Sequence, residues 1–412
     1  MPAFLPFAGV RYDCGTAGAD LDRLAAPPYD VVDDDEHAAL EAAHTHNAVR
    51  LILPRDDQDD GDRYARAAAT FARWRDEGAL VHDDEPRFYA YRMEYTGADG
   101  SARHTRGVLG ALALPEPGDD AILPHERTLP KAKSDRLALL SAMRVNVDPI
   151  WGLTPAAGLT QLLDPAVELC RCEDRDGVVH VLGAIDDPER VARISELVAS
   201  VPVVLADGHH RFETACNYRA LRRAEGVEDS GAGAIMTFVV ELADDELCIQ
   251  PIHRLLELPS DVDVRSRLAD AFAIESYGAD VTPDRVEALT RRMAAEQALG
   301  LVDRDGLALA VPVPAVRAAA LADEHPAVAS TDAAVVEALV VPRLPEASWA
   351  YRHDAAGCAA LVDKRAATAA ILCSPVSVAQ TREAATDRAR MPQKTTFFWP
   401  KPRTGMVFRP LD

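Results

Sequence analysis

Basic residues are scarce in this chain of 412 residues, which has 44 lysines and arginines against 66 aspartates and glutamates. The formal net charge of −22 argues against broad binding to nucleic acid or to anionic membranes, because a phosphate backbone needs a basic footprint. A small anionic ligand in a local basic pocket is still compatible with this charge. We therefore expect a small-molecule substrate, with no nucleic acid and no membrane as partner.

The sequence also lacks cysteine clusters and long apolar runs, and we expect no signal peptide. Its seven cysteines are scattered without a paired CxxC motif, which is typical of free thiols in a reducing compartment. The opening MPAFLPF has neither the basic lead nor the apolar core of a signal peptide. No run approaches the length of a membrane span. These features predict a cytoplasmic protein, and they leave open whether it forms a homo-oligomer.

Length and texture predict several domains of mixed α/β (α+β) fold. A chain of 412 residues is long for one core. Strand and helix patterns alternate through the middle, and the later segments read as helices over 262–273 and 283–297 with strands over 299–303 and 307–311. We predict an N-terminal α/β part (1–118), a central part (119–258) and a C-terminal α+β module with a docked terminal arm (259–412).

The densest group of reactive side chains is the motif ADGHHR, residues 206–211. It follows the apolar run 201–205, which predicts a buried strand, and it opens a segment whose apolar residues have helical spacing. A helix that starts after a strand presents unpaired N–H groups and the positive end of its dipole, and both favour phosphate. Gly208 lets the backbone approach an anion closely, and Arg211 can hold it with two hydrogen bonds.

Two other interpretations of this corner stay open from the residues alone. An Asp-Gly turn whose histidines happen to cap a helix is common, although a turn needs neither an arginine nor paired histidines. A zinc site is the other, but adjacent histidines project in divergent directions and no close-set Cys or His ligands accompany them.

Three further segments carry polar groups that a ligand could use: APPYDVV near the start, PHERT in the middle, and MPQKTTFFWPKP at the end. The two prolines of the first hold its backbone extended and present the following residues rigidly. A solvated loop and a docked terminal arm are the plain alternatives for the second and third. The candidate residues are Tyr29 and Asp30, then His125, Glu126 and Arg127, and finally Lys394 and Thr395.

Together and in this order, the four motifs resemble the bacterial and archaeal family called domain of unknown function 1015, over nearly the whole chain. The ADGHHR motif alone is similar to the phosphate-binding corner of the ParB/sulfiredoxin fold, whose free-serine kinases carry an Asp-Gly-His-His-Arg signature. This second resemblance implies a ParB/sulfiredoxin-like nucleotide-binding core embedded in a larger frame. A sulfiredoxin needs a cysteine inside the corner, where this chain has His209 after Gly208, and the net charge argues against a ParB-type DNA clamp.

The resemblance implies a small-molecule kinase that transfers a phosphoryl group from ATP or ADP, with Mg²⁺, to a hydroxylated metabolite such as free serine. Glu126 is assigned as the base only by its order along the chain. A non-catalytic nucleotide-sensing protein and a metal-assisted phosphoester hydrolase are the alternatives. The implied roles are phosphate binding by Gly208, His209, His210, Arg211, Lys394 and Thr395; catalysis by Glu126, Asp207 and His209; metal binding by Asp207; and substrate binding by His125, Arg127, Tyr29 and Asp30.

Overall fold

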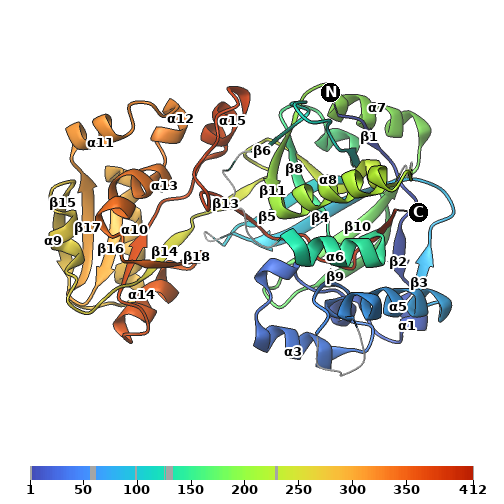
Figure 1. The fold of residues 1–412 in the computed structure, drawn as a ribbon, viewed down its shortest axis with the longest axis horizontal. Helices are drawn as coiled ribbons and strands as arrows, with labels where there is room; N and C mark the ends of the chain where they lie inside the picture. The colour runs from blue at the N-terminus through green and yellow to red at the C-terminus, as the bar shows by residue number, and fades with distance from the viewer. Residues whose placement is uncertain are drawn as a thin grey trace. The chain divides into compact units, whose positions relative to one another are not determined.

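The chain forms two compact units in a computed structural model (Figure 1). Unit 1 contains Met1–Pro124, Leu129–Cys248 and Pro400–Asp412, and unit 2 contains His125–Thr128 and Ile249–Trp399. The structure describes residues 2–55, 62–97, 100–124, 126, 133–227 and 231–411. Its helices and sheets confirm the predicted mixed α/β class, while the division into three parts stays a prediction.

A mixed nine-stranded sheet forms the centre of unit 1. Its strands lie in the order β6-β11-β8-β12-β5-β4-β10-β9, and β1 also pairs with β5. Strand β11 is parallel to β6 and antiparallel to β8, so it is held on both sides up to the corner that follows it. The bounds are β1 Phe4–Leu5, β4 Phe88–Thr96, β5 Ala102–Ala113, β6 Ile122–Pro124, β8 Ile150–Thr154, β9 Val167–Glu173, β10 Val179–Ile185, β11 Val203–Asp207 and β12 Ala234–Glu241.

Helices pack on this sheet and around the N-terminal segments. The buried face of α5 is Ala67, Phe71 and Trp74, with the helical spacing that makes a chain amphipathic. The principal helices of unit 1 are α3 Asp34–Ala43, α5 Arg63–Asp76, α6 Lys133–Met143, α7 Pro188–Ala199 and α8 His209–Ala224, and the shorter ones are α1 Cys14–Ala17, α2 Leu21–Leu24 and α4 Val49–Ile52.

Helix α8 packs Phe212, Ala215 and Cys216, which have helical spacing, against the core of unit 1, but not Ala220. Ala220 is exposed, while Ala215, Tyr218 and Arg219 are buried. Arg219 is buried because its guanidinium donates to the carbonyl oxygens of Leu114 and Pro115 at 2.7 and 2.6 Å. These hydrogen bonds let Arg219 take a buried place in the next turn, beside the apolar face.

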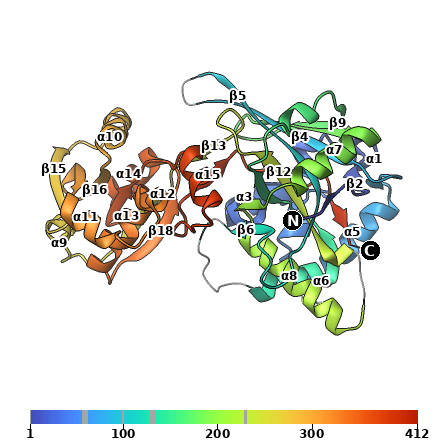
Figure 2. The ribbon, with the colours of Figure 1, turned by 90° about the horizontal axis from the view of Figure 1, so that it is seen from above.

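Unit 2 is built on a six-stranded antiparallel sheet of order β15-β17-β16-β19-β14-β18. Neighbouring residues on one strand enter opposite cores: Leu301 packs with one cluster and Val302 with the other. Helices α10 and α14 cover the second face, and α11 and α13 lie on the first (Figure 2). The bounds are β14 His253–Glu257, β15 Phe272–Gly278, β16 Leu299–Asp303, β17 Gly306–Pro312, β18 Ser348–Arg352, β19 Ala369–Leu372, α9 Val264–Leu268, α10 Pro283–Glu296, α11 Pro314–Ala320, α12 Pro326–Ala329, α13 Asp332–Val335, α14 Ala355–Asp363 and α15 Val378–Thr386.

Three of the four elements predicted in this region are confirmed, namely α10, β16 and β17. The helix predicted over 262–273 is wrong beyond Leu268, because Phe272 begins strand β15. Phe272 pairs with Pro312 at the edge of the sheet and is 2% exposed. Burial of a large side chain in the sheet therefore overrides the helical spacing before it.

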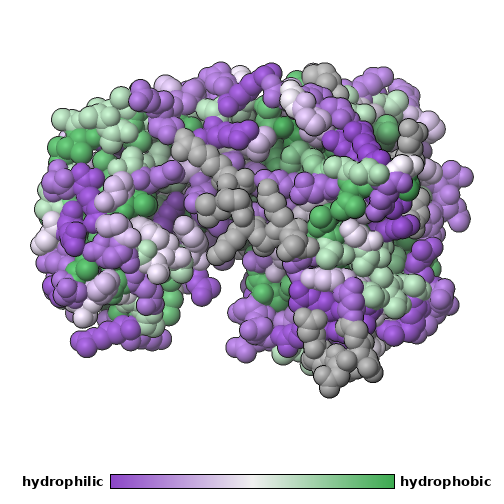
Figure 3. All heavy atoms as spheres, viewed as in Figure 1, coloured by the Kyte–Doolittle hydropathy of each residue, from purple (hydrophilic) through white to green (hydrophobic). Residues whose placement is uncertain are grey.

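The surface in Figure 3 is a mosaic in which hydrophilic residues surround smaller apolar areas. Within the described part of the chain, every helix is too short or too polar to cross a bilayer.

The buried His253 predicts an acid-sensitive fold. Burial, supported by the charge of Arg254, lowers the pKa of His253 to about 4. In an unfolded chain the pKa of histidine is ~6.5. Below that pH the unfolded chain therefore binds a proton, whereas His253 in the native state stays neutral. The free energy of unfolding should fall by roughly 3 kcal/mol as pH drops from about 6.5 to 4.

The substitution His253→Asn tests this, because its amide oxygen still offers an acceptor to the Cys373 N–H that His253 Nδ1 accepts at 3.1 Å. Urea unfolding at several pH values should show that the free energy of unfolding of the variant depends less steeply on pH. The same pH dependence of the free energy of unfolding in both proteins would show that His253 is not the cause of the acid sensitivity.

Candidate functional site

The strand–glycine–helix corner predicted from the sequence is present in unit 1. Strand β11 ends at Asp207, and Gly208 adopts a left-handed conformation with φ 88°. A Cβ on Gly208 would lie 2.9 Å from Ile150 Cγ2, so both conformation and space require glycine. Helix α8 begins at the next residue, and glycine has no side chain to cap it. The helix itself provides no acceptor for the first-turn amides of His209, His210 and Arg211.

Two cations hold the carboxylate of Asp207. Lys401 Nζ donates to Oδ1 at 2.6 Å, and Arg211 Nη2 donates to Oδ2 at 2.7 Å. Burial alone would raise the pKa of Asp207, but the charges of Lys401 and Arg211 prevail and hold it well below the ordinary value. Arg211 Nη1 also donates to the Pro149 carbonyl at 2.5 Å. Asp207 is therefore a fixed anion, and its partner Arg211 a fixed cation whose side chain is 12% exposed.

The N-terminal motif and the end of the chain meet beside this corner. Thr404 pairs with Ala26 through two backbone hydrogen bonds of 3.0 and 2.8 Å, and its hydroxyl donates to the Asp148 carboxylate. Burial raises the pKa of Asp148, although Arg211 opposes the shift. A carboxylic acid with a raised pKa beside an arginine is typical of a functional site.

Tyr29 and Asp30 lie in a short 3₁₀ turn, Tyr29–Val31, directly after the paired segment. The Tyr29 ring lies between two guanidinium groups, with Arg136 Cζ 4.6 Å and Arg211 Cζ 6.0 Å from its centroid. Asp30 is exposed to solvent, and its charge helps to raise the pKa of Arg211 against the opposing effect of burial.

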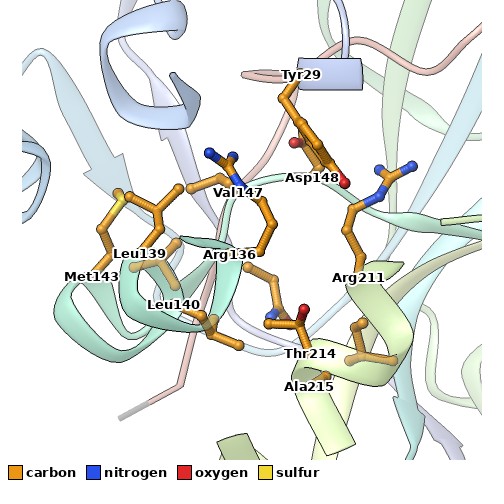
Figure 4. Close-up of a pocket in the computed structure, with 13 residues that line it drawn as sticks. Tyr29, Arg136, Leu139, Leu140, Met143, Val147, Asp148, Arg211, Thr214 and Ala215 are labelled. Carbon is orange, nitrogen blue, oxygen red and sulfur yellow. The ribbon is translucent and has the colours of Figure 1, made fainter. Parts of the chain in front are cut away.

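A cavity opens beside these groups between α6 and α8 (Figure 4). Its enclosed volume is about 60 Å³, and the surrounding solvent-filled mouth brings the total free space to about 500 Å³. Tyr29, Arg136 and Arg211 form a polar end, and the wall from α6 is apolar. The lining residues are Tyr29, Arg136, Leu139, Leu140, Met143, Val145, Asn146, Val147, Asp148, Arg211, Thr214, Ala215 and Ile235.

Glu126 belongs to unit 2, where it holds the C-terminal segment. Its carboxylate accepts hydrogen bonds of 2.8 to 3.1 Å from the amides of Lys394, Thr395 and Thr396 and one of 2.9 Å from the Thr396 hydroxyl. The Thr395 hydroxyl donates to the Pro392 carbonyl at 2.6 Å. The side chains predicted to act as base and phosphate donor thus serve contacts inside unit 2, and their catalytic roles stay predictions.

The structure brings one set of the predicted site residues together and places others elsewhere. His125 and Arg127 lie outside the described residues. The residues gathered in unit 1 are Tyr29, Asp30, Asp207, Gly208, His209, His210 and Arg211, and those in unit 2 are Glu126, Lys394 and Thr395.

Sequence reasoning missed Arg136, Asp148 and Thr404. A signal for the first was available, since Arg136 precedes Leu139, Leu140 and Met143 at helical spacing and all four line the cavity. A charged residue on an apolar helical stripe indicates a site or a buried ion pair. Asp148 and Thr404 meet across 256 residues and have no local pattern that reveals the contact.

A magnesium ion fits this site only in part. Both oxygens of Asp207 accept from cations, and within the described ranges no three carboxylate, imidazole or thiol groups gather as a metal cluster. Mg²⁺ commonly binds through one or two carboxylates together with substrate phosphates and water. The exposed carboxylate of Asp30 is available for such a role.

The chain belongs to the family described as "Protein of unknown function (DUF1015)", whose family model matches residues 4–334. This confirms the family resemblance. No curated protein matches the chain.

Among solved structures, a conserved hypothetical protein from Pyrococcus furiosus has a TM-score of 0.38 and 12% identity, covering 70% of this chain and 90% of its own. A free serine kinase in complex with AMP has a TM-score of 0.37 and 12% identity, covering 68% and 84%. SbnI with C-terminal truncation, from Staphylococcus aureus, has a TM-score of 0.35 and 12% identity, covering 74% and 87%. At these scores the likenesses carry no argument about activity.

The raised pKa of Asp148 predicts that Asp148→Asn stabilises the protein at neutral pH. In the window above pH ~3.8 the unfolded chain releases this proton before the native state does, so native stability falls as pH rises. Asparagine removes that ionisation and still offers Thr404 an acceptor. Urea unfolding should show a gain at pH 7 that shrinks towards pH 4. A loss of stability at pH 7 would show that Asp148 is a favourable charged partner of Arg211.

Proposed function

We propose that this protein is a nucleotide-dependent small-molecule kinase whose phosphate site is the Gly208 corner of unit 1. The observation that supports it is the helix N-terminus of α8 beside a cavity with one apolar wall and two guanidinium groups. A helix N-terminus favours phosphate, and an apolar wall favours a flat heterocyclic base. Phosphoryl transfer itself needs mainly positioned charge around the transferring group.

Each part of a bound nucleotide has a partner in this proposal. The phosphates accept from the α8 amides and from the imidazole of His210, which is exposed at the helix start. Arg211 contributes a positive charge whose direction Asp207 and Pro149 have already set. The base lies against the α6 wall, and when bound, Mg²⁺ would neutralise phosphate charge beside Asp30.

The structure favours Asp30 over the two carboxylates first considered for catalysis. Both oxygens of Asp207 accept from cations, and the carboxylate of Glu126 accepts from the segment 394–396 within unit 2. Asp30 is exposed near Arg211. We assign Asp30 to orient the hydroxyl of the acceptor, which the family resemblance implies is a hydroxylated metabolite such as free serine.

The same contacts support a second candidate, a nucleotide sensor without chemistry. If Asp30 does not act on an acceptor, the corner keeps its phosphate donors while its best-placed carboxylate, Asp207, stays bound to Lys401 and Arg211. A sensor binds the nucleotide and releases it unchanged. A kinase consumes it only when an acceptor is present.

The phosphate site predicts a specific loss in His210→Ala. Calorimetric titration with ADP and Mg²⁺ should show affinity reduced by about 10- to 100-fold, because one hydrogen bond to a charged group is lost. His82→Ala is the matched control, since His82 is also exposed but lies on β3 (Leu80–His82). Both variants should melt within a degree or two of the parent chain. Equal affinity in the three proteins, or no ADP binding in the parent, would contradict the phosphate site.

The catalytic assignment predicts that Asp30→Asn spares ADP affinity measured without Mg²⁺ and lowers turnover by about 10²- to 10⁴-fold, the range for removing a group that handles the acceptor proton. Nucleotide consumption is measured across hydroxy-amino acids, L-serine first. Asp34→Asn is the control, an exposed aspartate in the first turn of α3. If Asp30→Asn turns over as fast as the parent protein, Asp30 is not part of the mechanism. If the parent binds the nucleotide but does not consume it with any acceptor, the protein is a sensor instead.

A further inference from the structure

A second cavity, separate from the Gly208 corner, lies wholly within unit 2. Its volume is about 520 Å³, which is in the range of small-molecule sites. The wall from α10 has apolar residues, among them Pro283, Val286 and Met293, beside the polar Glu287, Thr290 and Arg291. Polar groups come from the start of β14, the start of α14 and the segment after β19, where His253, Asp354 and Cys373 line the cavity.

His253 places an unused N–H donor in the wall of this cavity. It is 1% exposed, and its Nδ1 accepts from the Cys373 amide at 3.1 Å. A neutral imidazole that accepts at Nδ1 carries its hydrogen on Nε2. Within the part of the chain that the structure describes, His253 makes no second hydrogen bond. This N–H belongs to a residue that lines the cavity, and a ligand there can supply its acceptor.

A carboxylate from the protein lies near the same point. Asp354 precedes helix α14, lines the cavity, and its side chain does not cap the helix. Its charge acts on His253, as does that of His353, which stacks on Phe397 with ring centroids 4.5 Å apart. Further out on α10, Glu287 and Arg291 pair with each other at 3.6 Å and largely cancel.

Thiol chemistry does not explain the cavity. Cys373 is buried, and burial raises its pKa to about 11, so it is a thiol at neutral pH. Its sulfur accepts from Arg254 at 3.5 Å. A nucleophile or a thiolate metal ligand needs the deprotonated form.

We infer that this cavity binds a small aliphatic α-amino acid. Its carboxylate accepts from His253 Nε2–H, its ammonium pairs with Asp354, and its side chain packs against Val286 and Met293. A simple carboxylate would be repelled by Asp354, and a simple amine would leave the His253 donor unused. The zwitterion satisfies both groups at once. The inference is independent of the function proposed for unit 1.

Calorimetric titration of the full chain with L-leucine and two truncated analogues tests the zwitterion. The analogue 4-methylpentanoate lacks the ammonium, and 3-methylbutylamine lacks the carboxylate. L-leucine should bind at least about tenfold more tightly than either, because each analogue loses one charge-assisted contact. L-serine should bind more weakly than L-leucine for want of an aliphatic side chain. No binding of L-leucine, or binding no tighter than that of an analogue, would overturn the inference.

Two substitutions locate the binding. Asp354→Asn should weaken L-leucine binding about tenfold without weakening that of 4-methylpentanoate, whereas His253→Asn should weaken both. Asp363→Asn, at the far end of the same helix, is the control and should change neither. Thermal melting of each variant checks that it is folded. Unchanged L-leucine affinity in Asp354→Asn and His253→Asn would show that the amino acid binds elsewhere and would overturn the site.

Discussion

The ion pairs of Asp207 with Lys401 and Arg211 determine the geometry of the candidate site. They tie the end of β11, the first turn of α8 and the C-terminal segment to one carboxylate. Removing one partner of this partly buried group should destabilise the protein, because the remaining charge is left uncompensated. The arrangement therefore fixes the Arg211 guanidinium before any ligand arrives, and little reorganisation is needed when a phosphate binds.

The same constraint limits what Asp207 can do. A carboxylate that accepts from two cations is a poor proton acceptor and has few lone pairs left for a metal. Chemistry at this corner must then use another group, and Asp30 is the exposed carboxylate beside it. A reactive role for Asp30 is what would distinguish the proposed kinase from a sensor at the same corner.

The C-terminal segment divides its contacts between the two units. Residues 394–396 surround the Glu126 carboxylate in unit 2, whereas Lys401 and Thr404 contact Asp207 and Asp148 in unit 1. The four sequence motifs thus form two sets, each joining a C-terminal part to an earlier motif. Contacts of this kind explain why a proline- and aromatic-rich end is ordered.

Local pattern predicted what depends on local physics. Periodicity and turn residues sufficed for α10, β16, β17 and the corner at Gly208. Long-range contacts could not be predicted. Lys401 contacts Asp207 across 194 residues, and the local sequence around either residue does not indicate that contact. Tertiary burial also overrode helical spacing at Phe272, where strand β15 begins.

Hydrogen–deuterium exchange of the full chain, with and without ADP and Mg²⁺, tests the phosphate site most directly. Bound phosphate should slow exchange of the amides of residues 209–211 at the start of α8, while the distant part of the same helix exchanges as before. Unchanged exchange at those amides under saturating ADP, or slowing only in other segments, would contradict a phosphate site at Gly208.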